Sequence, residues 1–404
     1  MCRGSSLNPR SDDLEMATMK RSTDRILTTH TGSLARPREL LEAMRARLNS
    51  EPYDAEAYAN GVRSAVAGVV NNQIENGIDV VTDGEQSKAG FFAYVRERLG
   101  GFEPVAGQPP SRGMQWVKEI SAFPEYYEQY FSRNMRGVAP TTPLICNGPV
   151  TYKGQAAVQT DIENLKVALV GHDPADVFMP ATAPRDLGKN EYYRTTEELL
   201  AAVAEAMRTE YQAIVEAGFT LQVDDPALTD FYSQDPDTSL DERRKTAELH
   251  IEAINHALRG IPPERIRFHT CYGINHGPRV FDTPLRDVID LMLKVNAGAY
   301  SFEAANPRHE HEWRVWEDVK LPEGKIIIPG VITHASNIVE HPEWIAERIV
   351  RYAKLVGREN VIAGSDCGFS SQATPEPEIH PKVVWAKFAA MAEGARLATQ
   401  QLWR

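Results

Sequence analysis

The chain has 404 residues, 42% of them hydrophobic and 25% charged, which is typical of a globular protein with one large domain or two ordinary ones. Acidic residues outnumber basic ones by 56 to 44, and the net charge of −12 argues against nucleic acid as a partner. No segment approaches the roughly 20 apolar residues of a membrane span, so no membrane association is expected.

The first 23 residues are polar and lack the apolar segment of a secretory signal. We predict a disordered leader over residues 1–23 and a single domain over residues 24–404. Of the four cysteines, Cys2 falls in this leader, which leaves Cys146, Cys271 and Cys367 in the body. An odd number is a poor disulfide framework and indicates a reducing, cytoplasmic environment.

Short apolar runs alternate with longer segments whose apolar residues have helical spacing. Continuous apolar runs are typical of strands buried on both faces, and their alternation with helices predicts a parallel sheet. The helical segments include 201–218, 282–298 and 341–357, each of which ends in glycine, a common helix stop. The runs are ILTTH, IDVVTDG, PLICNG, DVFMPA, FTLQVDD, IRFHT, AYSFEA, KIIIPG and NVIAGSD.

Nine runs approximate eight strands and one irregular piece, so the predicted fold class is α/β, a (β/α)8 TIM barrel. The alternative is a doubly wound sheet, but such sheets carry a G-x-G-x-x-G turn after the first strand, and none occurs there. Residues 104–142 break the alternation and are rich in proline, arginine and aromatic residues. We predict an insertion here that passes over the barrel mouth as a lid or a dimer contact. A homo-oligomer is therefore one of the expected possibilities.

Four residues with metal-binding side chains lie at or just past the ends of predicted strands: His269, Cys271, Glu303 and Cys367. The carboxyl ends of all strands of a parallel barrel meet at one face, so these residues can converge. One imidazole, one carboxylate and two thiolates suit four-coordinate Zn²⁺. The alternative is structural, because single cysteines and histidines on apolar strands are often ordinary core residues.

Six motifs in order suggest a family: TTHTGSLARP, VTDGEQ, LQVDDPAL, HTCYG, SFEAAN and GSDCGF. Over residues 24–400 the chain resembles the catalytic domain of cobalamin-independent methionine synthase and its single-domain relatives. The resemblance implies a barrel with zinc at its mouth, held by the four residues above. Zinc would bind the sulfur of a small-molecule thiol as a thiolate, which attacks the carbon of an alkyl donor.

By the same motifs, Ser33, Glu85 and Asp224 would hold homocysteine, with the two acids accepting hydrogen bonds from its ammonium. Taken alone, Glu85 could instead be a helix N-terminal acid and Asp224 a turn residue. The family's catalytic acid corresponds to His334 in PGVITHAS. This segment is one residue shorter than the family pattern and lacks its aspartate, so an exposed loop histidine is the alternative.

Other departures bear on the substrate. The fourth barrel segment, VFMPATAPRDL, lacks the tryptophan that stacks on folate in the synthase, and His30, a second candidate catalytic residue, replaces a smaller residue. In NPRHEHEW, Arg308 and His309 would form a cationic substrate pocket, unless they belong to a solvated loop. These features support a second hypothesis for the reaction: the opening of an epoxide by a thiol, as in epoxyalkane:coenzyme M transferases, or the reverse reaction, catalysed by a thioether lyase. A third is a metal-binding protein without catalysis.

Overall fold

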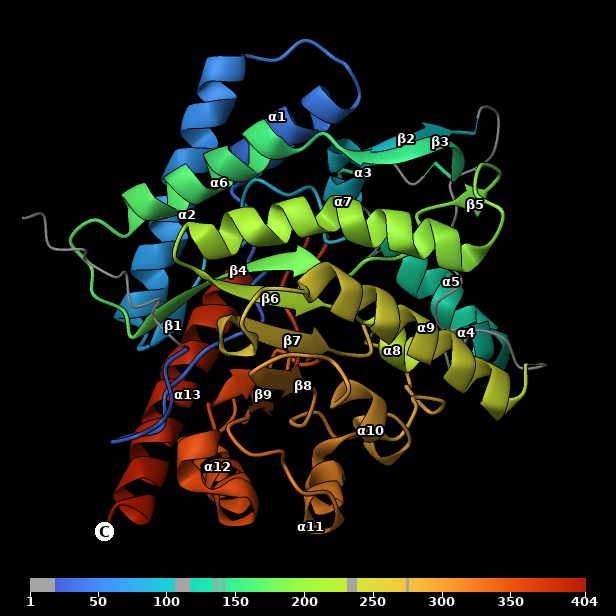
Figure 1. The fold of residues 1–404 in the computed structure, drawn as a ribbon. Helices are drawn as coiled ribbons and strands as arrows, with labels where there is room; N and C mark the ends of the chain where they lie inside the picture. Colours follow the sequence, from blue (N-terminus) through green and yellow to red (C-terminus); the bar gives the residue numbers. More distant parts are fainter. Residues whose placement is uncertain (1–18, 106–116, 134–136, 140–141, 231–237, 274–275) are drawn as a thin grey trace, which may run out of the picture.

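The computed structural model describes residues 19–105, 117–133, 137–139, 142–230, 238–273 and 276–404. Its main sheet has seven parallel strands in the spatial order β1-β4-β6-β7-β8-β9-β10 (Figure 1). The strands are β1 (Val80–Val81), β4 (Asp176–Thr182), β6 (Thr220–Asp224), β7 (Ile266–Thr270), β8 (Ala299–Phe302), β9 (Ile326–Ile332) and β10 (Gly364–Ser365).

The first predicted run, residues 26–30, is not a regular strand but lies between the two edges of this sheet. On one side Thr29 N donates to Ala363 O over 2.8 Å, just before β10. On the other side Val80 N of β1 donates to Thr28 O over 3.0 Å. The segment therefore takes the eighth position of the barrel through a few backbone hydrogen bonds. Neighbouring strands follow one another in sequence order across the whole sheet, whereas a doubly wound sheet reverses its strand order at one point. The doubly wound alternative is therefore wrong, and the predicted barrel is confirmed.

The third run, PLICNG, is the irregular piece. It belongs to β3 (Leu144–Tyr152), which lies in a separate three-stranded sheet. There β3 pairs antiparallel with β2 (Leu99–Pro104) and parallel with β5 (Lys189–Asn190). Apolar composition alone could not separate this strand from the barrel strands, because both kinds bury apolar side chains.

Helices follow most barrel strands and pack on the outside of the sheet (Figure 1). Helix α12 begins at Pro342 and ends before Gly357, as predicted, and the φ of Gly357 is 92°. The long helices are α1 (Arg38–Leu48), α2 (Ala55–Glu75), α6 (Gln155–Ala168), α7 (Thr196–Glu216), α9 (Leu240–Leu258), α12 (Pro342–Val356) and α13 (Pro381–Leu402). The short ones are α3 (Ala93–Arg98), α8 (Ala227–Asp230), α10 (Ile289–Met292) and α11 (Val315–Asp318).

The segment 282–298 differs from its predicted single helix. It forms a 3-10 turn, η2 (Leu285–Asp287), followed by the one-turn helix α10. Val288 between them has a φ of −125°, which breaks the helical path. Further 3-10 turns are η1 (Pro263–Arg265), η3 (Glu310–Arg314) and η4 (Arg358–Asn360).

The insertion predicted at residues 104–142 contains α4 (Val117–Ala122) and α5 (Pro124–Arg133), while 106–116, 134–136 and 140–141 lie outside the described residues. Glu119 of α4 accepts hydrogen bonds from Arg279 N and Phe281 N, and Tyr126 of α5 donates to His276 O over 2.8 Å. These partners follow β7, so both helices lie at the carboxyl ends of the barrel strands (Figure 1).

Of the leader predicted at 1–23, residues 1–18 lie outside the described part of the chain. The remainder packs on the barrel, since Met19 N donates to Glu264 O and the buried Ser22 donates to Val361 O. Residues 19–23, predicted to belong to the leader, therefore contact the barrel. Among the described residues, no helix combines the length and apolarity that a bilayer crossing requires.

Candidate active site

Three of the four predicted metal ligands meet at the carboxyl ends of the strands. His269 lies in β7, Cys271 follows that strand, and Cys367 follows β10. The two Sγ atoms are 3.3 Å apart, and one nitrogen of His269 lies within 4.8 Å of both. All three side chains are buried. The register of the parallel strands therefore brings together residues almost 100 positions apart in sequence.

The electrostatics of this cluster suit a cation. The hydrogen bond from Cys367 and burial raise the pKa of the Cys271 thiol well above its usual range. Burial and the nearby Arg267 lower the pKa of His269 to about 3, so its imidazole is neutral. His269 Nδ1 lies 3.0 Å from Ser301 Oγ, whereas Nε2 is buried without a partner among the described residues. A neutral nitrogen and two adjacent sulfurs form a soft donor set.

Glu303, the fourth predicted ligand, belongs to a neighbouring group with His334 and Asp366, whose polar atoms lie within 4.8 Å of one another. Its Oε1 accepts from Tyr272 N over 2.8 Å, and its Oε2 pairs with Arg279 over 2.9 Å. Burial raises the pKa of Glu303 to about 7. The structure thus places Glu303 beside the three-residue cluster, with its carboxylate already held by protein groups.

A cavity opens on the cluster and is lined by the three residues predicted to hold homocysteine, Ser33, Glu85 and Asp224. Ser33 Oγ lies 3.3 Å from Ser371 Oγ on one wall. Two phenylalanines from the segment that precedes α3 form an apolar part of the wall. The lining residues are Thr31, Ser33, Glu85, Phe91, Phe92, Asp224, Pro226, His269, Cys271, Gly273, Cys367, Ser371 and Gln372.

Glu85 and Asp224 face this cavity as a pair of buried carboxylates. Asp224 Oδ1 accepts from Gln222 Nε2 over 2.7 Å, whereas Glu85 Oε2 has no hydrogen-bond donor within the described ranges. Burial, and then the charge of Glu85, raise the pKa of Asp224 well above its usual range. Burial also raises the pKa of Glu85, which has a φ of 57°, a strained value for a residue with a side chain. Such a pair is stabilised when a cation lies between its members.

Comparison with known proteins agrees with this geometry. The sequence model of the family described as "Cobalamin-independent synthase, Catalytic domain" matches residues 26–170 and 181–390. That is most of the chain.

The chain belongs to this family.

Individual relatives extend over nearly the whole length of this member. The methionine synthase of Saccharolobus solfataricus is 25% identical, and the match covers 93% of this chain and 96% of that protein. The methionine synthase of Sulfolobus acidocaldarius is also 25% identical, with 93% of both chains covered. The resemblance predicted from the motifs is therefore confirmed, and with it that the chain is an enzyme.

Two solved structures share its fold. A B12-independent methionine synthase from Shewanella sp. W3-18-1, in complex with selenomethionine, has a TM-score of 0.71 at 20% identity and covers 94% of this chain and 99% of its own. A vitamin-B12-independent methionine synthase from Listeria monocytogenes, described as putative, has a TM-score of 0.63 at 20% identity and covers 92% and 98%.

In this family member the candidate acid His334 lies just behind the cavity. Its Nε2 is 3.2 Å from Gly273 O, a cavity-wall residue, while its Nδ1 has no partner among the residues described. Burial and Arg279 lower the pKa of His334 to about 4. His334 is buried, not an exposed loop residue as the alternative would have it.

His30, Arg308 and His309 are not among the cavity-lining residues. His30 is buried, with Nε2 2.8 Å from Gln73 Oε1 and Nδ1 accepting from Gly32 N. Arg308 is exposed and donates to Val280 O. The structure therefore does not bring these residues to the thiol-side cavity.

His309 is neither solvated nor free to meet a substrate. It is buried, and its ring nitrogens lie 2.8 Å from Glu312 Oε2 and 3.0 Å from Asp282 Oδ2. Burial lowers the pKa of His309, but the two carboxylates outweigh it and raise the value to about 9. Because Asp282 also pairs with Arg279, His309 supports the arginine that holds Glu303.

Several residues of the site were not among the predicted site residues. Asp366 Oδ1 accepts from Ala304 N and Ala305 N, each over 2.7 Å, and so ties the end of β8 to that of β10. Its position directly before Cys367 was an available signal. Phe91 and Phe92 carried none, because their segment shows no strand or helix periodicity.

The raised pKa values of the acid pair predict how stability depends on pH. Above about pH 4 the unfolded chain releases carboxyl protons that folded Glu85 and Asp224 retain, so the ligand-free fold loses stability as pH rises toward their folded pKa values. Asp224→Asn keeps the acceptor for Gln222 and removes the larger shift. At pH 7 we expect this variant, without metal or ligand, to be more stable than wild type by about 1 kcal/mol or more.

Urea denaturation at pH 5 and pH 7 measures this effect. The gain of Asp224→Asn over wild type should be larger at pH 7. An equal or smaller gain at pH 7 would mean that Asp224 is not a strained carboxylate.

Proposed function

We propose that this enzyme transfers a methyl group to the sulfur of homocysteine. The observation that carries the proposal is that one cavity is lined both by three metal-type donors, His269, Cys271 and Cys367, and by the buried acid pair Glu85 and Asp224. The first group suits a sulfur and the second an ammonium. A molecule that carries both groups a few bonds apart is an amino thiol, and the curated relatives named above are methionine synthases.

We further propose that Zn²⁺ is the resident metal. His269, Cys271 and Cys367 would hold it, and the buried, unpartnered Nε2 of His269 fits that role. Glu303 would join them only after giving up part of its bonding to Tyr272 and Arg279, so we assign it as the conditional ligand. When bound, zinc supplies Lewis acidity that lowers the pKa of an incoming thiol.

The remaining residues position the amino thiol. Glu85 and Asp224 each accept a charge-assisted hydrogen bond from its ammonium, which relieves the cost of burying two carboxylates together. The hydroxyls of Ser33 and Ser371, both on the cavity wall, donate to its carboxylate. These contacts direct the sulfur toward the cysteine cluster. The apolar rings of Phe91 and Phe92 keep water from the nucleophile.

In the transfer itself, a bond forms between the thiol sulfur and the methyl carbon as the bond from that carbon to the donor breaks. The leaving atom keeps the electron pair of the broken bond and needs a proton if it is basic. We assign the transfer of this proton to His334: its ring is neutral near pH 7 because burial lowers its pKa, so its unpartnered Nδ1 first takes up a proton from solvent and then passes it to the leaving atom. The two substrates are thus a small-molecule thiol and an alkyl donor.

The epoxide-opening alternative is less well supported. Coenzyme M carries a sulfonate and no ammonium, so it would bring no cation to the cavity side of Glu85 and Asp224 and would add a negative charge instead. The residues expected to form its cationic pocket, Arg308 and His309, are occupied elsewhere. A cytoplasmic location fits the cysteines of the described residues, Cys146, Cys271 and Cys367, all of which are free. Self-association through the 104–142 insertion stays a prediction.

Calorimetry on zinc-loaded protein tests the proposal. Homocysteine binding near pH 7 should release about one proton more per site than binding of methionine, which has the same ammonium but no thiol, because the thiol loses its proton on binding. The proton count follows from the dependence of the binding enthalpy on buffer ionisation enthalpy. A proton count that is no larger for homocysteine than for methionine would show that the thiol keeps its proton and would refute this function.

A further inference from the structure

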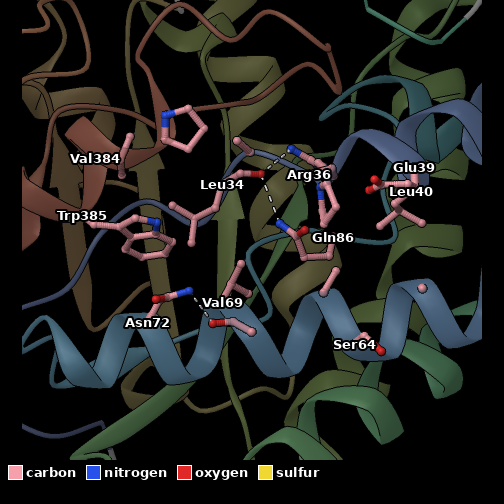
Figure 2. A pocket seen from close by; sticks show the side chains of 16 residues that line it. Leu34, Arg36, Glu39, Leu40, Ser64, Val69, Asn72, Gln86, Val384 and Trp385 are labelled. Atoms are coloured by element: carbon pink, nitrogen blue, oxygen red, sulfur yellow. Dashed lines mark hydrogen bonds between the residues drawn. The ribbon is translucent and has the colours of Figure 1, made fainter.

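Arg36 is buried beside the active-site cavity without being one of its lining residues. Its NH1 donates to Leu34 O over 3.1 Å and to Ser370 O. Its NH2 donates to Glu85 O over 2.7 Å and to Lys88 O over 2.9 Å. All four acceptors are backbone carbonyls, and Figure 2 shows the bond to Leu34. Both terminal nitrogens of the guanidinium are therefore fully used as donors within the protein.

The four carbonyls belong to three segments that are far apart in sequence and that each carry a residue of the cavity wall. These cavity residues are Ser33, Glu85 and Ser371. One carbonyl is that of Glu85 itself, and a second follows it by three residues. The other two belong to the direct sequence neighbours of the two serines. One side chain thus joins the three segments that carry these residues.

The three cavity residues lie in turns or irregular backbone, so no regular ladder of hydrogen bonds fixes the distances between them. Single backbone bonds join their segments. Leu34 N donates to Gly84 O over 3.1 Å, and Phe369 N donates to Ser33 O over 3.0 Å. The arrangement of this part of the wall therefore depends on side chains that bridge the segments.

Gln86 is a second bridging side chain. It is fully buried, and its Nε2 donates to Leu34 O over 3.2 Å and to Gly84 O over 3.1 Å. Leu34 O thus accepts from Gln86 and from Arg36, as Figure 2 shows. Gln86 bonds two of the segments, whereas Arg36 bonds all three.

Glu85 depends on this support more than the two serines do. Its φ of 57° lies in the left-handed region, which a residue with a side chain seldom adopts. Such a backbone persists only where the surrounding structure holds it. Arg36 NH2 bonds the carbonyl of Glu85 and lies 3.9 Å from its Oε2, so one guanidinium contacts both its backbone and its carboxylate.

We propose that Arg36 is a positioning residue for the amino-acid end of the thiol substrate. It sets the distances between Ser33, Glu85 and Ser371, which contact the ammonium and the carboxylate of homocysteine in the proposed function, on which this inference rests. The substrate does not touch Arg36. The four bonds of Arg36 also end on none of the three metal-type donors that take the sulfur. Its effect is therefore confined to the amino-acid end.

Calorimetry on the zinc-loaded full chain compares homocysteine with 2-mercaptoethanol, a thiol that has no amino-acid end. Arg36→Met removes all four bonds and keeps an unbranched side chain. It should weaken homocysteine binding by at least about tenfold and change 2-mercaptoethanol binding by less than about twofold. Arg36→Lys keeps the charge but offers one nitrogen in place of two, so its loss of homocysteine affinity should be smaller and in the same direction.

Arg265→Met is the matched control. Arg265 is also buried and its NH2 donates to a backbone carbonyl, that of Phe219, but it directly precedes β7, at the opposite end of the strand from the site. This variant should bind both thiols as wild type does. Circular dichroism must show that each variant is folded, and Arg36→Lys takes the place of Arg36→Met if the latter is not.

Hydrogen exchange followed by mass spectrometry, on zinc-loaded protein without a thiol, tests whether Arg36 joins the segments. The amides of Leu34, Lys88 and Phe369 are hydrogen-bonded, one in each segment. The folded Arg36 variant should exchange faster in the peptides that contain all three, and Arg265→Met should not. Faster exchange near position 36 alone, or no change, would overturn the proposal.

The two thiols decide the rest. Equal losses of affinity for both thiols in a folded Arg36 variant, or an unchanged affinity for homocysteine, would overturn the proposal as well. A wild-type protein that binds 2-mercaptoethanol but not homocysteine would refute the proposed function instead. In that case hydrogen exchange would still decide whether Arg36 holds the three segments together.

Discussion

Replacing Cys271 or Cys367 with serine is expected to abolish metal binding and activity while the barrel still folds. The two sulfurs, 3.3 Å apart, are the soft donors of the cluster, and a serine hydroxyl is not deprotonated at neutral pH to replace one of them. Zinc content should fall from about one per chain to near zero, and activity by more than about 100-fold, since even outer residues of metal sites are worth 10- to 100-fold. Elemental analysis and circular dichroism measure the two outcomes.

Cys146→Ser is the matched control. Cys146 is also free and buried, but it lies in β3, outside the cluster. This variant should keep both zinc and activity. Full zinc content in Cys271→Ser and Cys367→Ser would contradict the assignment of the metal site.

Removing one acid of the pair should separate amino thiols from other thiols. Glu85 and Asp224 would each hold the ammonium of homocysteine with a charge-assisted hydrogen bond worth about 1.5–3 kcal/mol. Glu85→Gln or Asp224→Asn should therefore weaken homocysteine binding by roughly ten- to a hundredfold. Affinity for coenzyme M, which has no amine, should stay the same or increase. Both thiols are titrated into each zinc-loaded variant.

Asp225→Asn is the control for this series, because Asp225 is a buried neighbouring carboxyl that is not among the cavity-lining residues. It should leave homocysteine affinity nearly unchanged. A wild-type protein that ignores homocysteine, binds coenzyme M tightly and loses it on Arg308→Ala or His309→Ala would favour the epoxide-opening alternative instead.

Much of the fold was available from the sequence, because a parallel barrel imposes a repeating pattern on the chain. Continuous apolar runs gave β4, β6, β7, β8 and β9. The pattern failed where long-range pairing decides the structure. Residues 26–30 look like a strand but make only a few bridging bonds, and PLICNG looks like a barrel strand but pairs with β2 and β5. Local composition cannot distinguish partners that lie far apart in sequence.

The same limit applies to the site. Residues at strand ends converge by the geometry of the barrel, so His269, Cys271 and Cys367 could be placed together from their positions alone. The distant partners of the histidines could not be foreseen. His309 is paired by Asp282, 27 residues away, and His30 by Gln73, 43 residues away. Likewise, nothing in SFEAAN showed that Arg279 and Tyr272 would hold Glu303.

X-ray absorption at the zinc edge, with and without homocysteine, tests most directly whether the thiol sulfur reaches the metal. In the zinc-loaded protein, Cys271 and Cys367 should give two sulfur ligands. Homocysteine should add a third, and Cys271→Ser or Cys367→Ser should show no zinc signal in either state. A sulfur count that does not change when saturating homocysteine is added would contradict the proposed function.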